Sequence, residues 1–122
     1  MNVVLIVCAI VLAIASLAVS VPKLRLEGTA WTMLRSRALV QNQVRMIGAA
    51  EIAGAAGVLV GLFVWPIGAV AAGGLLLLGL AATGFHAKHG DYGNPDTRAT
   101  SLPSVYFAVL AAVTFVLFLV AH

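Results

Sequence analysis

The stretch NVVLIVCAIVLAIASLAVSV, residues 2–21, decides the fold because it contains no charged side chain. A helix that crosses a bilayer needs roughly 20 apolar residues, and this one is followed at once by Lys23 and Arg25. A cleavable signal peptide is the alternative, since residues 18–20 resemble a cleavage site. The positive region that precedes the apolar core of such peptides is missing, however, and the core is too long. Residues 2–21 therefore predict a membrane-spanning helix.

Three further apolar stretches follow, at residues 44–64, 66–85 and 103–121. Four spans require about 80 residues, which suits a chain of 122 residues that is 62% hydrophobic and only 9% charged, with a mean hydropathy of +1.09. This composition excludes a soluble enzyme and a disordered chain, and a single cysteine excludes a disulfide framework. We expect an all-α, polytopic membrane four-helix bundle that forms one domain over residues 1–122.

The segment between the first two spans, residues 27–43, is too polar to cross a membrane. Trp31, Leu34 and Ala38 would share one face if this segment were helical. The pattern predicts an amphipathic helix that lies in the headgroup region.

The basic residues are distributed on one side of this arrangement. All of them lie in or beside the loops 22–43 and 86–102: Lys23, Arg25, Arg35, Arg37, Arg45, Lys88 and Arg98. The positive-inside rule predicts that both loops are cytoplasmic and both termini outside, in the cell inner (plasma) membrane. We interpret the net charge of +3 as a consequence of how the chain is oriented in the membrane and of contacts with anionic lipid. We expect no nucleic-acid partner, because no nucleic-acid recognition pattern accompanies the charge.

Small residues are spaced for close helix packing, which holds helices together where lipid supplies no hydrophobic drive. The predicted packing positions are Ala49, Ala53, Gly57 and Gly61 on the second span, and Ala72 and Gly79 on the third. The fourth span has no glycine, and its bulky side chains predict a place at the periphery or at an oligomer face.

Glu51 is the one carboxylate within a span, about 9 Å along the helix from Arg45. Arg45 would point about 120° away, so His86 or Lys23 from another helix is the expected partner. Two interpretations stay open besides an inert, protonated Glu51. The carboxylate forms a structural pair between helices, or the four residues line a polar pocket for a ligand headgroup or a proton relay.

A metal site is the other chemistry to consider, because His86, His89 and Asp91 lie close in sequence. The His-x-x-His spacing lacks further ligands, and we expect no metal.

The run VRMIGAAEIAGAAGVL, residues 44–59, resembles the DoxX-like family of small four-helix membrane proteins. Lys23 after the first span, Pro66, and His86 followed by Gly90 and Asp91 also fit that pattern. The resemblance covers nearly the whole chain, and its most specific residues are Arg45, Gly48, Glu51 and His86.

The resemblance implies an accessory or anchoring subunit of a quinone-linked redox complex or a stress-response complex, with quinone or lipid as the ligand near Glu51 and His86. An assembly or scaffold protein is the alternative, and a small proton-coupled transporter is a third that the charge asymmetry disfavours. Because residues to hold haem or an iron–sulfur cluster are missing, we expect no covalent cofactor and no catalysis by this chain alone. The expected partners are the bilayer and either further copies of the chain or a larger membrane complex.

Overall fold

The computed structural model describes residues 3–25, 32 and 41–121, and its four long elements are all helices. They are α1 (Val3–Arg25), α3 (Gln41–Gly61), α4 (Trp65–Lys88) and α5 (Pro95–Val120). Each contains a stretch long and apolar enough to cross a membrane, which for α5 begins at Ser101. The structure thus confirms the all-α, four-span fold. The predicted interfacial helix at residues 27–43 falls largely outside the described residues.

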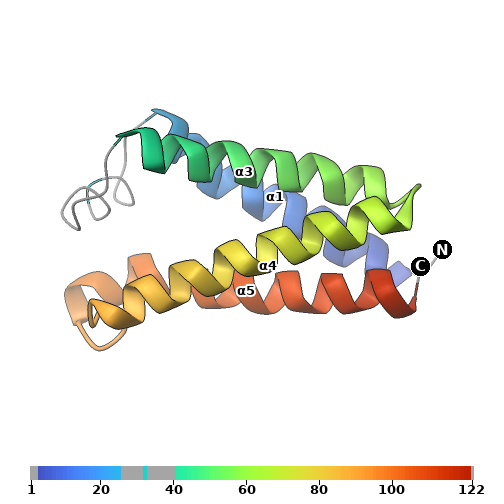
Figure 1. Cartoon of the computed structure of the whole chain (residues 1–122). Coiled ribbons are helices and arrows are strands. Elements are labelled where there is room, and N and C mark those ends of the chain that lie inside the picture. Colours follow the sequence, from blue (N-terminus) through green and yellow to red (C-terminus); the bar gives the residue numbers. More distant parts are fainter. Residues whose placement is uncertain (1–2, 26–31, 33–40, 122) are drawn as a thin grey trace.

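The four helices are arranged as two pairs (Figure 1). Helix α1 lies along α3 and α4 lies along α5, while α3 and α4 join the pairs through the short turn that follows Gly61. Figure 1 shows α3 and α4 close together at this turn and further apart at their opposite ends. The N and C labels lie near each other at the end where the turn is.

The largest differences from the predicted helix boundaries are at the end of α1 and at the start of α5. Helix α1 continues to Arg25, about one turn beyond the expected end at residue 21, so that Lys23 is part of the helix. Helix α5 begins at Pro95, and Pro103, the expected first residue, lies inside it. The two polar turns before Pro103 are helical but lie mostly outside the apolar stretch. A proline inside a membrane helix lowers stability little where neighbouring groups satisfy the carbonyl that loses its hydrogen bond.

The contact between α1 and α3 uses alternating steps of four and three residues. On α3 this buried face consists of Val44, Gly48, Glu51, Ala55 and Val58. A Cβ atom at Gly48 would lie 3.1 Å from the Ser20 carbonyl oxygen and 3.3 Å from the Lys23 Cβ. The bare Gly48 backbone therefore lets the last turns of α1 approach α3 closely.

The contact between α3 and α4 is built on glycines near the turn. Gly57 faces Ala71, and Gly61 lies against the Gly68 backbone. Phe118 of α5 is fully buried and packs against the same Gly68. These residues belong to the main hydrophobic core or border it, so the tightest packing lies at the end of the bundle where the chain turns.

The predicted packing positions on α3 differ in their surroundings. Gly57 and Gly61 pack against α4, but Ala49 and Ala53 are exposed. A spacing of four residues drifts by about 40° per step, so this line of small residues leaves the closest α3–α4 contact, and Ala53 lines the groove between the two helices. On α4, Ala72 and Gly79 are buried as expected, with Gly79 against Ala108 of α5.

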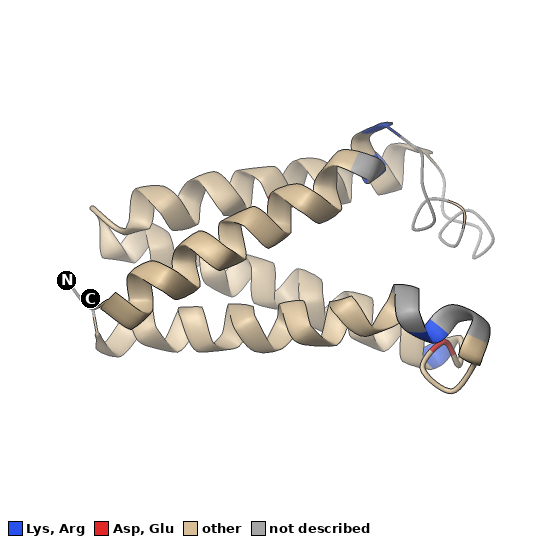
Figure 2. Ribbon diagram, turned by 180° about the vertical axis from the view of Figure 1, so that it is seen from behind, with Lys and Arg blue, Asp and Glu red and all other residues tan. Residues whose placement is uncertain are grey.

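The outer surface of the bundle suits a bilayer. Only 28–33% of each apolar stretch is buried, and large aliphatic side chains cover the outside of all four helices. The described Lys and Arg residues all lie at the end opposite the termini (Figure 2). This places the charges at one edge of the apolar region, as the sequence predicts.

We predict that Gly61→Ala destabilises the protein, because the new methyl group would lie 2.6 Å from the Gly68 nitrogen and 3.2 Å from the Phe118 ring. The expected loss is about 1–3 kcal/mol of unfolding free energy, measured as a lower melting temperature in detergent. Gly84→Ala on α4 is the matched control, since a Cβ there meets no atom within 4 Å. Equal melting temperatures for the two variants would contradict this packing.

Candidate functional site

Glu51 is paired with Lys23, one of its two expected partners. The Lys23 Nζ donates a hydrogen bond to the Glu51 Oε1 at 2.7 Å, joining α1 to α3. Glu51 is 4% exposed, and the Lys23 side chain is 17% exposed. The pair therefore lies within the packed helix contact near the end of α1. Its second carboxylate oxygen, Oε2, makes no hydrogen bond with the described residues.

Arg45 does not contact Glu51, which agrees with its expected direction on the helix. Its Nε donates to the backbone carbonyl oxygen of Leu24 at 3.3 Å. That carbonyl belongs to the last turn of α1, where carbonyl groups have no partner within the helix. A cation is favoured at this end of a helix. Arg45 and Glu51 thus both connect α3 to the end of α1. Arg45 contacts the Leu24 carbonyl, and Glu51 contacts the Lys23 side chain.

Two serines on the buried face of α1 are satisfied within their own helix. Ser16 Oγ donates to the Leu12 carbonyl at 2.8 Å, and Ser20 Oγ donates to the Leu17 carbonyl at 2.9 Å. Both serines are fully buried. They add no donor to the Lys23–Glu51 pair, and the local bond to the preceding turn is the usual one for a serine inside a helix.

His86 is positioned by the turn that ends α4. Gly90 has a φ of +69°, the left-handed conformation that glycine adopts readily. The Asp91 N–H donates to the His86 carbonyl at 2.9 Å, and the Gly90 N–H donates to the Ala87 carbonyl at 3.1 Å. These are the two bonds of a Schellman motif. The motif folds Asp91 back over the last turn of α4, directly beside His86.

The side chains of His86 and Asp91 then pair in a buried site. The His86 Nδ1 lies 2.8 Å from the Asp91 Oδ2, with Asp91 fully buried and His86 9% exposed. Ser101 of α5 places its Oγ 3.3 Å from the same Nδ1. A carboxylate at Nδ1 favours the tautomer that carries its proton on that nitrogen, with Nε2 as the hydrogen-bond acceptor. The Nε2 makes no hydrogen bond with the described residues.

Further hydrogen bonds tie the loop after α4 to α5. The hydroxyl groups of Tyr92 and Ser104 lie 2.5 Å apart, and the Ser104 Oγ also donates to the Ser101 carbonyl at 2.7 Å. The Tyr92 ring packs edge-on against His86, with centroids 6.1 Å apart. The His86 cluster therefore fixes the start of α5 against the end of α4.

The two polar clusters belong to different helix pairs. Lys23 and Glu51 join α1 to α3, whereas His86, Asp91 and Ser101 join α4 to α5. Within the described residues, no hydrogen bond connects one cluster to the other. The sequence grouped Glu51 and His86 because both lie near the same membrane face, and the structure gives each a separate partner.

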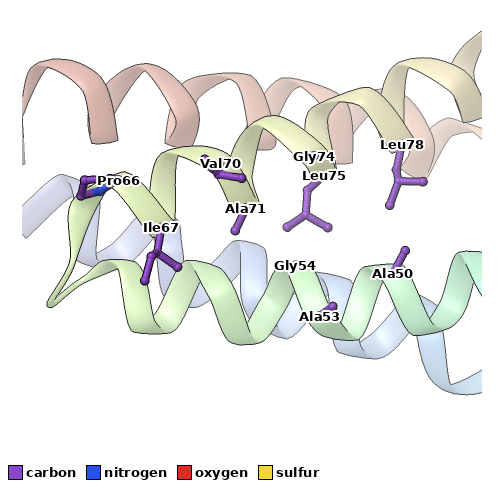
Figure 3. A pocket seen from close by; sticks show the side chains of 10 residues that line it. All are labelled: Ala50, Ala53, Gly54, Pro66, Ile67, Val70, Ala71, Gly74, Leu75 and Leu78. Atoms are coloured by element: carbon purple, nitrogen blue, oxygen red, sulfur yellow. The ribbon is translucent and has the colours of Figure 1, made fainter.

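A groove between α3 and α4 has a volume of about 650 Å³. Figure 3 shows its lining, which comes from the middle of α3 and from the first half of α4. The lining is apolar throughout: Ala50, Ala53, Gly54, Pro66, Ile67, Val70, Ala71, Gly74, Leu75 and Leu78. Neither Glu51 nor His86 is among these residues. The groove can therefore accept an apolar chain, but neither polar cluster forms part of its wall.

Sequence reasoning named Glu51, Lys23 and His86 but missed Ser101 and the role of Asp91. The glycine at position 90 was the available signal for Asp91, because a glycine after a helix predicts the Schellman turn that brings the next residue back. Ser101 gave no comparable signal, since its approach to His86 depends on how α5 packs. Groups of three or more His, Cys, Asp or Glu residues that could hold a metal ion do not occur in the described part of the chain.

These features define a multi-pass helical membrane protein with one polar cluster in each helix pair. The family model of the DoxX-like family matches residues 2–114, and the chain belongs to that family. No curated protein and no solved structure matched the chain in the corresponding comparisons.

We predict that Lys23→Met and Glu51→Gln each lower the melting temperature in detergent, because each leaves a buried polar group without its partner. Breaking a buried pair costs about 3–5 kcal/mol, and the partial exposure of Lys23 places the loss at the lower end. In the double variant the two losses should not add, with a coupling of about 1–2 kcal/mol.

The pair of Glu51→Gln with Asp91→Asn is the matched control. The two carboxylates lie in different clusters and share no partner among the described residues, so their effects should add. Additive losses for Lys23→Met and Glu51→Gln would instead show that the Lys23–Glu51 contact contributes nothing to stability.

Proposed function

We propose that this protein is an accessory or anchoring subunit that assembles with other proteins in the membrane. The observation that carries the proposal is the pairing of Glu51 with Lys23 across the α1–α3 contact. A carboxylate that is closed by a neighbouring helix, away from the groove, suits a group that orders the bundle. The broad apolar outer surface of the helices is then the surface available for partners in the bilayer.

The partner complex is of the kind that the family resemblance implies, a quinone-linked redox complex or a stress-response complex. In such a complex a partner protein supplies the redox chemistry and this chain supplies anchoring. Self-association is the other form of assembly we propose. The outer face of α5 supports it, because exposed Tyr106, Val109, Val113 and Val116 follow one another at intervals of three and four residues.

Binding of a quinone or a lipid by its apolar tail is the second candidate function. The groove between α3 and α4 favours it, because an apolar wall of this length suits a flexible hydrocarbon chain. A headgroup at Glu51 or His86 would require the ligand to extend beyond the groove, because neither residue lines it. A proton-coupled transporter fits less well, since the groove is lined by apolar residues alone.

Native mass spectrometry of the protein, extracted gently from its own membrane, separates these functions. We expect partner proteins to remain bound to the wild type and to Gly74→Leu. Gly74 lines the groove and has open space at its Cβ, so leucine would fill the groove without a clash. Gly84→Leu is the control, because its Cβ is equally free but lies outside the groove.

Two results would contradict the anchoring role. A wild type that carries a quinone or lipid and no protein partner would favour the second candidate function, above all if Gly74→Leu loses the small molecule and Gly84→Leu keeps it. A monomer without a protein or small molecule would count against both functions.

We further propose that the loops at residues 22–43 and 86–102 face the cytoplasm, and that both termini lie outside the inner (plasma) membrane. The clustering of basic residues at one end supports this orientation. In a Cys8→Ser background, a cysteine at the exposed Lys88 should resist a membrane-impermeant thiol reagent in intact cells, and a cysteine at the exposed Phe63 should react. The reverse pattern would contradict the orientation.

A further inference from the structure

Each of the four helices carries an exposed cation at the loop end of the bundle. Arg25 is in the last turn of α1, Arg45 in the first turns of α3, Lys88 at the end of α4 and Arg98 at the start of α5. Figure 2 shows these positions at the end of the bundle opposite the termini. The two carboxylates whose side chains are described are both buried, Glu51 against Lys23 and Asp91 against His86. The described side chains therefore give this end of the bundle a positive surface.

Two of these cations, Arg45 and Arg98, are held in the same manner. The Arg45 Nε donates to the Leu24 carbonyl at 3.3 Å, and the Arg98 Nε donates to the Tyr92 carbonyl at 2.9 Å. In each arginine, the hydrogen bond from Nε to a backbone carbonyl outside its own helix restricts the orientation of the guanidinium group. The two terminal nitrogens of each guanidinium make no hydrogen bond with the described residues. Each arginine thus presents an oriented pair of N–H donors on an exposed surface.

An oriented guanidinium is the side-chain group best matched to a phosphate, because its planar donors can bind two phosphate oxygens at once. Lys88 has the same charge but makes no hydrogen bond with the described residues that would orient it. Arg45 and Arg98 should therefore bind phosphate more tightly than Lys88, although all three attract anions.

The positions of Arg45 and Arg98 relative to the apolar segments of their helices indicate the source of the phosphate. Arg98 precedes Ser101, where the apolar stretch of α5 begins, by about 4.5 Å along the helix. Arg45 is followed directly by Met46, which is 70% exposed. Both guanidinium groups therefore lie beside apolar segments that can cross a bilayer, so in a membrane they are expected near the lipid phosphates, with acyl chains against the neighbouring apolar side chains.

We propose that Arg45 and Arg98 each bind the phosphate group of an anionic phospholipid. One site lies on the α1–α3 pair and the other on the α4–α5 pair. The proposal does not depend on the anchoring function, because either site would operate in a protein of any activity.

Lipid binding by the purified full-length chain tests this proposal. The protein is delipidated in a neutral detergent, and phosphatidylglycerol or phosphatidylcholine with the same acyl chains is added, with bound lipid counted by native mass spectrometry. Arg45→Gln and Arg98→Gln should each lower the affinity for phosphatidylglycerol about tenfold at the affected site and leave phosphatidylcholine binding unchanged. Arg45→Lys and Arg98→Lys should lose most of this affinity too, because they keep the charge and lose the paired donors.

Lys88→Gln is the matched control, since it removes one exposed charge at the same end of the bundle. Its loss should not exceed about fivefold. An equal loss in Lys88→Gln and the arginine variants would overturn the proposal, because it would show unspecific attraction to surface charge. Melting temperatures measured without lipid identify any variant that fails to fold. Because Arg45 and Arg98 lie in separate helix pairs, the proposal can be tested at one arginine if the variant at the other does not fold.

Two competing ligands complete the experiment. Inorganic phosphate at the concentration of the lipid phosphate should not displace phosphatidylglycerol, and displacement would indicate a site for a soluble anion. A polyglutamate peptide should likewise fail to compete. A peptide that displaces the lipid and binds through the same two arginines would overturn the proposal in favour of an acidic protein partner.

Discussion

Glu51 places a carboxylate inside a membrane-spanning helix, where leaving it unpaired would cost several kcal/mol. The cost is offset by Lys23, which lies 2.7 Å away on α1. Lys23 can reach Glu51 because α1 remains helical to Arg25 and because Gly48 lets the two backbones approach. The ion pair joins the end of α1 to the buried face of α3, and it holds the two helices in one alignment along their length.

In the α4–α5 pair, the buried Asp91 carboxylate is paired with a residue close to it in sequence. His86 and Asp91 are five residues apart, and the Schellman turn at Gly90 brings their backbones and their side chains together. Ser101 then joins the cluster from α5. The bundle thus has a polar connection within each helix pair at the loop end, and contacts of small and apolar side chains between α3 and α4 near the Trp65 turn. The groove between α3 and α4 begins beside that turn and follows the first half of α4.

Sequence reasoning predicted the four spans and the two partners that Glu51 could have, because apolar length and the cost of a buried charge are local properties. It could not choose between Lys23 and His86, since that choice depends on which helices are neighbours. Ala49 and Ala53 lie outside the closest α3–α4 contact because a four-residue spacing drifts around the helix. Pro103 was misplaced because a proline can start a helix or be accommodated within one. The groove could not be predicted, since it depends on where α3 and α4 pack.

The Lys23–Glu51 contact in a lipid bilayer is the most direct test of this account. Solid-state NMR can measure the distance between a ¹⁵N label at the Lys23 Nζ and a ¹³C label at the Glu51 carboxyl carbon in reconstituted membranes. Lys88, which forms no ion pair with the described residues, is the internal reference. We predict a separation of about 3.5 Å, as expected for a charge-assisted hydrogen bond. A separation beyond about 6 Å would exceed hydrogen-bond range and would contradict the assignment of this ion pair as the contact that aligns α1 with α3.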